Sequence, residues 1–167
     1  MRSVCVVPLS VVMLALVTPL AAAEENQNWP QFRGPRCDGT TDQAGLPLKW
    51  SETSNVVWKT PIDGKAWSSP VVWGSQVWMT NAPADGKAMY AVCVDAGSGK
   101  IVHNVKLWAV AKPETCNAMN SYASPTPCLA KGRVYVHFGT YGTACLDAAT
   151  GKVLWQRHDL HCDHAQG

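Results

Sequence analysis

Short runs of β-branched and aromatic residues, broken by Gly, Asp and Ser, dominate the chain from Asn55 onward. This pattern is typical of short strands separated by tight turns. No window beyond residue 23 shows convincing 3.6-residue periodicity, and Pro113 makes the ambiguous stretch 109–121 a loop rather than a helix. Strands are expected at 56–60, 70–73, 76–80, 89–94, 100–105, 133–138, 143–146 and 152–155. The sequence therefore predicts an all-β protein.

Two stretches of the chain, residues 68–100 and 123–152, repeat one pattern. Each begins with Ser-Pro before a strand, has a Gly at the following turn, and ends in an Asp-containing turn that closes on Gly-Lys. The repeat unit is about fifty residues, the size of one four-stranded propeller blade. Two unrelated hairpins are the alternative, but the same turn chemistry at the same place in both copies favours a true repeat.

The turn that ends each copy explains why its residues recur. Asp95 and Asp147 can accept hydrogen bonds from backbone N–H groups two or three residues further on. Gly99 and Gly151 supply the positive φ that leads the chain into the next strand. In the second copy a tryptophan, Trp155, follows eight residues after the aspartate, whereas the first copy has His103 at that position.

The first 23 residues have the composition of a signal peptide. Arg2 precedes an apolar run over 4–20, and Ala21-Ala22-Ala23 supplies the small residues that signal peptidase requires. An uncleaved membrane anchor is the alternative, but Pro8, Pro19 and the alanine triplet favour cleavage. We therefore expect an exported protein, periplasmic or extracellular, with no integral membrane span after cleavage.

Residues 24–57 are rich in Gly, Pro and Asn and are expected to form an irregular lead-in that packs through Trp29, Phe32 and Trp50. The propeller blades are expected over residues 58–167. The chain stops where a further strand would follow, so a truncated sequence is expected.

Net charge is +2 without any block of Lys or Arg, which argues against a nucleic-acid partner. Of the seven cysteines, Cys5 falls in the leader, which leaves six in the rest of the chain. In an oxidising compartment these six can form disulfides or remain buried thiols, and the sequence favours neither. No Cys-x-x-Cys pair is present, which argues against a zinc knuckle or a thioredoxin-type redox pair.

Residues 146–155 resemble the tryptophan-docking motif of PQQ-like β-propeller repeats. The segments 28–35 and 67–72 resemble the start of bacterial exported PQQ-binding-like propeller proteins, relatives of the outer-membrane-protein assembly propeller. The resemblance implies that each blade's tryptophan packs against the turn of a neighbouring blade. It implies this structural docking motif: Asp95, Gly99, Lys100, Asp147, Thr150, Gly151, Lys152 and Trp155.

The same resemblance implies a seven- or eight-bladed ring, of which this chain holds about two four-stranded blades and one extra strand around Trp58. Two features depart from the family pattern. Cys93 and Cys145 stand where the family usually has alanine, and the first copy lacks the docking tryptophan because His103 replaces it.

A polar cluster near the end of the chain contains possible metal ligands. On an extended strand His158, Cys162 and His164 would share one face, and imidazole and thiolate are transition-metal ligands. A polar connector between blades is the alternative, and it is favoured because His161 and Asp163 would point the other way.

The resemblance implies two classes of function. One is a non-catalytic scaffold for binding or assembly in the cell envelope, with an envelope protein as partner. The other is a quinoprotein-dehydrogenase-like oxidoreductase, quinone- or metal-dependent, whose site lies in further blades. Such enzymes typically use vicinal cysteines, a Trp platform and a carboxylate–Asn set that holds Ca²⁺.

The residues favour the scaffold. No Cys-Cys dipeptide occurs, and Trp67, Trp73 and Trp78 are interpreted as packing between sheets. PQQ is implied only by the family resemblance. No catalytic or cofactor-binding residue is assigned, and residues 117–122 are expected to form a polar loop at one end of the blades.

Overall fold

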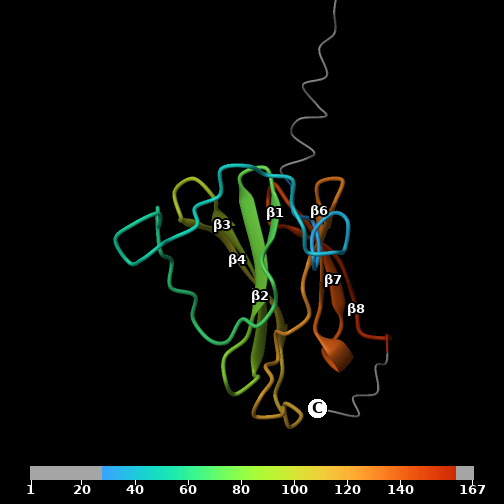
Figure 1. Ribbon diagram of the computed structural model, residues 1–167. Coiled ribbons are helices and arrows are strands. Elements are labelled where there is room, and N and C mark those ends of the chain that lie inside the picture. Colours follow the sequence, from blue (N-terminus) through green and yellow to red (C-terminus); the bar gives the residue numbers. More distant parts are fainter. Residues whose placement is uncertain (1–27, 161–167) are drawn as a thin grey trace, which may run out of the picture.

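The computed structural model describes residues 28–160, which form two four-stranded antiparallel sheets lying side by side (Figure 1). The expected signal peptide, Cys162 and His164 lie outside the described residues. The first sheet contains β1 (Val71–Trp73), β2 (Gln76–Asn81), β3 (Ala88–Asp95) and β4 (Ile101–Ala109). The second contains β5 (Cys128–Ala130), β6 (Arg133–His137), β7 (Thr143–Asp147) and β8 (Val153–Arg157). A short 3-10 helix, η1 (Gly139–Tyr141), joins β6 to β7.

Both sheets are simple meanders, in which each strand pairs with the next one along the chain. This order is the arrangement of a propeller blade, where the first strand is innermost and the fourth is outermost. The prediction of an all-β fold with two four-stranded blades is therefore confirmed.

The core lies between the two sheets. Because side chains alternate along a strand, one face of each sheet is directed at the other. Trp78 and Met89 from the first sheet and Val134 and Leu146 from the second are fully buried and belong to one continuous cluster. Burial of these large apolar side chains is the main force that holds the two sheets together.

The lead-in is joined to both sheets by backbone hydrogen bonds. Trp29 exchanges two bonds of 2.8 Å with Val72 of β1, and the Pro30 carbonyl accepts from Leu129 of β5 at 2.8 Å. The expected packing through all three aromatic residues is wrong for two of them. Phe32 is 58% exposed and Trp50 is 70% exposed, and Trp29 alone is half-buried, with its ring against Gly34.

Three other expectations need correction. The stretch 56–60 is not a strand of either described sheet, and its hydrogen bonds to the first sheet come from the Trp58 and Thr60 side chains. Strand β5 was not expected, since three residues are too short for a periodic pattern. Trp78 packs between the sheets as expected, but Trp67 and Trp73 are exposed.

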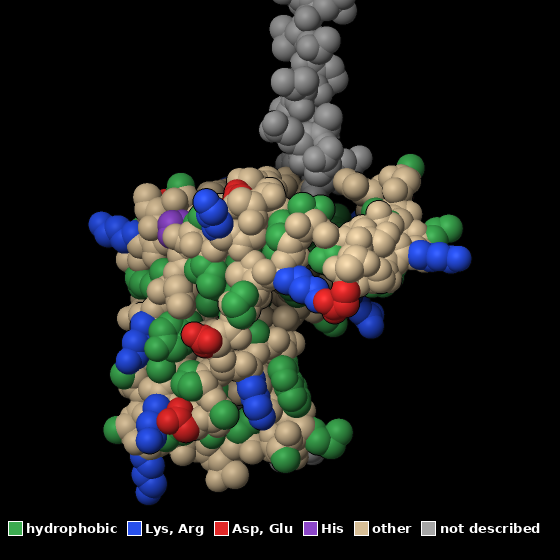
Figure 2. Space-filling model, turned by 90° about the vertical axis from the view of Figure 1, so that its left-hand side faces the viewer, with side chains coloured by type: hydrophobic (Ala, Val, Ile, Leu, Met, Phe, Trp, Pro, Cys, Tyr) green, Lys and Arg blue, Asp and Glu red, His purple; other side chains and the backbone are tan. Residues whose placement is uncertain are grey.

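No helix within residues 28–160 is long and apolar enough to cross a membrane. Figure 2 views the molecule from the left-hand side of Figure 1. On this face Lys, Arg, Asp and Glu are scattered among hydrophobic and neutral atoms. The face therefore carries no large area of one sign.

Candidate functional site

The turn over residues 95–100, here called the first turn, is closed by its aspartate. The Asp95 carboxylate oxygen Oδ1 accepts from the Ser98 backbone N–H at 2.8 Å and from the Ser98 hydroxyl at 2.6 Å. The Asp95 carbonyl accepts from Gly99 N–H at 2.8 Å, and Asp95 N–H donates to the Lys100 carbonyl at 2.9 Å. These bonds lower the pKa of Asp95, with the Ser98 hydroxyl as the largest cause.

The turn over residues 147–152, the second turn, has the same geometry. Asp147 Oδ1 accepts from the Thr150 backbone N–H at 2.9 Å and from its hydroxyl at 2.7 Å. The Asp147 carbonyl accepts from Gly151 N–H, and Asp147 N–H donates to the Lys152 carbonyl, both at 2.9 Å. The Thr150 hydroxyl is the largest cause of a lowered pKa for Asp147. The glycines of the two turns have φ of +70° and +68°.

Trp58 packs against the first turn. Its indole N–H donates to the Ala96 carbonyl at 2.8 Å, and its ring lies over Gly99. A Cβ atom added to Gly99 would lie 2.6 Å from Trp58 Cδ2, so only glycine fits beneath the ring. The Thr60 hydroxyl donates to the Gly99 carbonyl. Residues 58–60 therefore bind the turn of the first sheet through their side chains.

His103 packs against the second turn. Its ring lies over Gly151, where an added Cβ would come within 2.8 Å of His103 Nδ1. The same ring stacks on Trp78, with centroids 5.6 Å apart and planes 20° apart. The hydrogen bond that an indole would supply comes instead from Gln76, whose side-chain amide donates to the Ala148 carbonyl at 2.7 Å. Two side chains thus replace one tryptophan, and the contribution of Gln76 was not foreseen.

Trp155 is the counterpart of His103 in the second sheet. In the first sheet His103 lies opposite Cys93 on β3. In the second, Trp155 lies opposite Cys145, and Cys145 lies opposite Tyr135. We call Tyr135, Cys145 and Trp155 the open docking face. The Trp155 side chain is 38% exposed, and no turn within residues 28–160 covers it.

Both buried cysteines belong to these equivalent positions. Burial raises the pKa of the Cys93 thiol to about 12, and it also raises the pKa of Cys145. The five cysteines of the described range are free thiols. Inert, buried thiols of this kind contribute packing volume rather than reactivity.

The structure places His158 against the second sheet's end rather than in a ligand cluster. Its Nε2 accepts from the Trp108 indole N–H at 3.3 Å, and its Nδ1 lies 3.1 Å from the Tyr141 carbonyl. Because both ring nitrogens have partners, a metal would have to displace one of them. In the part of the chain that the structure describes, no group of three or more His, Cys, Asp or Glu could hold a metal ion.

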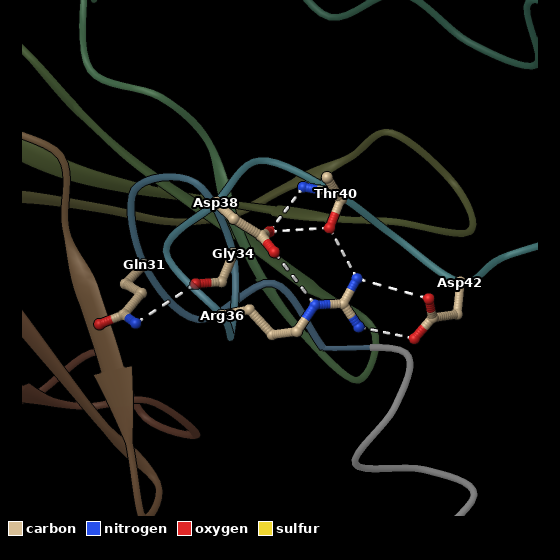
Figure 3. Close-up of polar contacts among 6 residues, drawn as sticks. All are labelled: Gln31, Gly34, Arg36, Asp38, Thr40 and Asp42. Atoms are coloured by element: carbon tan, nitrogen blue, oxygen red, sulfur yellow. Dashed lines mark hydrogen bonds and ion pairs between the residues drawn. The ribbon is translucent and has the colours of Figure 1, made fainter.

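Two of the hollows within residues 28–160 are candidate ligand sites. The larger, about 630 Å³, lies beside Arg36 in the lead-in. The Arg36 guanidinium bonds Asp42 at 2.6 Å, the Thr40 hydroxyl at 2.7 Å and Asp38 at 3.4 Å (Figure 3). Its charge is therefore already matched by two carboxylates, and this cation is not available to an anionic ligand.

The smaller hollow, about 150 Å³, lies at the end of the blades where the loop 110–127 meets η1. We call it the aromatic hollow. It is lined by the aromatic residues Tyr122, Phe138 and Tyr141, by Glu114, and by small polar residues. Burial raises the pKa of the Tyr141 phenol, and the nearby Glu114 carboxylate adds to this effect. The sequence indicated a polar loop here but no site.

Comparison with known proteins identifies the class of protein. The family model described as "Outer membrane protein assembly factor BamB" matches residues 40–159. The chain therefore belongs to this family of PQQ-like β-propeller repeat proteins, as the docking motif predicted. No curated protein matches the chain.

Among solved structures the chain is similar to one titled "Europium-containing methanol dehydrogenase", at 18% sequence identity and a TM-score of 0.41. The match covers 64% of this chain and 18% of that one, so the chain spans a small part of the enzyme's length.

Neither of these two hollows fits the anionic quinone that gives the repeat family its name. The aromatic hollow has no Lys, Arg or His in its lining, and its single charged side chain, Glu114, would repel a carboxylate. The lead-in hollow has Arg36, which is already paired. Neither hollow offers the cationic partner that a buried or half-buried anion requires.

Proposed function

We propose that this protein is exported to the cell envelope and acts there as a non-catalytic scaffold for binding or assembly. The match of residues 40–159 to the family described as an outer membrane protein assembly factor carries this proposal. The three residues of the open docking face occupy the same register positions as Trp78, Cys93 and His103 in the first sheet. In the first sheet, these positions form the face that binds the second turn. The second sheet therefore presents a surface already shaped to bind a glycine-containing turn of another segment.

The chemistry of that surface supports binding. Trp155 and Tyr135 have ring centroids 6.2 Å apart and are backed by a rigid antiparallel sheet. Tryptophan and tyrosine are the side chains that most often dominate binding energy at protein interfaces. The family model's description, an outer membrane protein assembly factor, supports an assembly role in the envelope.

Site-specific crosslinking in living cells tests the proposal. The full-length protein carries p-benzoylphenylalanine in place of Tyr135, and a control carries it in place of Val102, an exposed residue of the outermost strand of the first sheet. We expect ultraviolet light to join the Tyr135 variant, and not the control, to a defined envelope protein. Replacing Trp155 with alanine in the same background should weaken that complex about thirty-fold, since such a residue contributes about 2 kcal/mol.

Three results would overturn the proposal. Crosslinks confined to the protein's own chain would show that the face is an internal contact. Recovery of the protein in the cytoplasm with residues 1–23 still attached would contradict export. A spectral shift and substrate turnover when PQQ and Ca²⁺ are added to the full-length protein would favour the oxidoreductase instead.

A further inference from the structure

The aromatic hollow combines three aromatic side chains with one carboxylate in its lining. Tyr122 and Tyr141 meet edge to face, with centroids 6.2 Å apart and planes 61° apart. Phe138, also in the lining, is held by an edge-to-face contact with Trp108 at 5.3 Å. Aromatic rings attract cations to their faces, so a lining that contains three aromatic side chains favours a positively charged guest.

Glu114 is fixed at this hollow by both tyrosines. Its backbone N–H donates to the Tyr141 hydroxyl at 2.9 Å, and its carbonyl accepts from the Tyr122 hydroxyl at 2.6 Å. No ion pair to the Glu114 carboxylate exists within residues 28–160. The backbone of Glu114 is therefore held in position, and its exposed carboxylate forms no ion pair with residues 28–160.

No positive side chain lines the hollow to neutralise that charge. Lys65 lines a separate hollow of about 120 Å³, which shares the wall formed by Cys116, Asn120, Ser121 and Tyr122. The single carboxylate therefore leaves the lining of this hollow with a net negative charge, which attracts a cation.

We propose that the aromatic hollow binds a small organic cation, an alkylammonium group about the size of a trimethylammonium head. The volume of about 150 Å³ corresponds to roughly ten water-sized spaces, which is enough for such a group. Because Tyr141 accepts the Glu114 N–H, its own hydroxyl proton can be donated to an oxygen on the ligand.

Other ligand classes match the lining less well. An anion would meet the Glu114 carboxylate with no compensating cation. Calcium requires six to eight oxygen ligands, including several carboxylates or carbonyls, whereas this hollow supplies one carboxylate. A neutral ligand would leave the carboxylate unused. Among these ligand classes, an organic cation is the one that uses both the Glu114 carboxylate and the aromatic side chains of the lining.

A pair of nearly isosteric probes tests the charge directly. Choline and its uncharged carbon analogue, 3,3-dimethylbutan-1-ol, are titrated into the full-length protein at low ionic strength, and dissociation constants are measured by ligand-observed NMR. We expect choline to bind at least about ten-fold more tightly than the alcohol, because cation–π attraction and the carboxylate act on choline alone.

Matched charge variants locate the site. Glu114→Gln keeps the side-chain shape and should weaken choline binding about five-fold. Glu52→Gln makes the same charge change in the lead-in, where the carboxylate pairs with Lys59, and should leave binding unchanged. Because the Glu114 side chain is exposed and has no ion pair within residues 28–160, Glu114→Gln is expected to fold like the parent, which circular dichroism checks.

Equal affinity for choline and the alcohol, equal effects of the two Gln variants, or no choline binding at about 50 mM would each overturn the proposal. The amide of Nα-acetyl-lysine serves as a further probe of the ligand's source. Tighter binding of this probe than of choline would assign the ammonium group to a partner's lysine, and the reverse order would assign it to a free small molecule.

Discussion

Replacing Gly99 with alanine should destabilise the protein by about 2–4 kcal/mol. Two costs combine. The backbone has φ of +70°, and holding an alanine in this left-handed region costs about 1–2 kcal/mol. The new methyl group would lie 2.6 Å from the Trp58 ring, which must move and lose its 2.8 Å hydrogen bond to Ala96, a further loss of about 1–2 kcal/mol.

Gly74→Ala is the matched control. Gly74 also has positive φ, +56°, but an added Cβ there meets no atom within 4 Å. Gly74→Ala therefore has the cost of a left-handed backbone but not the steric clash with a ring. Urea denaturation of the full-length protein, followed by circular dichroism, should show that Gly99→Ala costs about 1–2 kcal/mol more than Gly74→Ala.

A double variant separates the collision from other effects. Once Trp58 is replaced by alanine, Gly99→Ala should cost no more than Gly74→Ala, because no ring remains to be displaced. Equal costs for the two glycine variants in the parent protein would refute the role assigned to the ring. So would full additivity of Trp58→Ala and Gly99→Ala.

Three further predictions concern the second turn and the thiols. Gln76→Leu should cost about 1–2 kcal/mol in urea denaturation, because it leaves a turn carbonyl without its donor. The pKa of Asp147 is lowered in the folded protein, chiefly by the Thr150 hydroxyl, so its stabilising effect is complete above its ordinary value of 3.8 and is lost as pH falls through the folded value. Thermal melts from pH 5 to pH 2 should therefore decline less steeply in Asp147→Asn. Iodoacetamide at pH 8 should label the exposed Cys37, whereas Cys93, with a pKa of about 12, should react only after unfolding.

Each of these three predictions would be contradicted by a specific result. A Gln76→Leu variant as stable as Gln43→Leu, a change in the exposed lead-in, would show that the amide bond contributes nothing. Identical pH dependence of the melting temperature in the parent and in Asp147→Asn would show that the carboxylate does not stabilise the turn. Rapid labelling of Cys93 in the folded protein, measured by peptide mass spectrometry, would contradict its burial.

The repeat could be predicted from the sequence because its defining bonds are local. Asp147 and Thr150 are three residues apart, and a left-handed glycine follows at once, so the turn's chemistry can be read from one short segment. The strands between such turns follow from β-branched and aromatic runs. Fold class and blade order therefore depend on features that a single sequence contains.

The partner of each turn could not be predicted in the same way. Gln76 and its acceptor are 72 residues apart, and a glutamine at the start of a strand carries no distinctive signal. The stretch around Trp58 has the composition of a strand, but Val57 is 88% exposed and the segment's bonds to the first sheet come from side chains. Composition indicates what a segment can form, and its neighbours decide what it does form.

The aromatic hollow was missed for a related reason. Tyr141 and Glu114 are 27 residues apart, one in the short helix η1 and the other in a loop, and neither segment carries a sequence signal for the contact between them. Pro113 and the polar residues indicated a loop at 109–121, and the structure has a loop there from residue 110 onward, since Ala109 still belongs to β4. Only the three-dimensional arrangement shows that this loop brings a carboxylate to a group of rings.

The order of docking partners along the chain gives the fold a direction of growth. Trp58 precedes the turn to which it binds, and His103 precedes the second turn. Chains are synthesised from the N-terminus, so each ring is made before the turn that will cover it. The first sheet thus supplies a docking surface for the turn of the second sheet, which lies later in the chain.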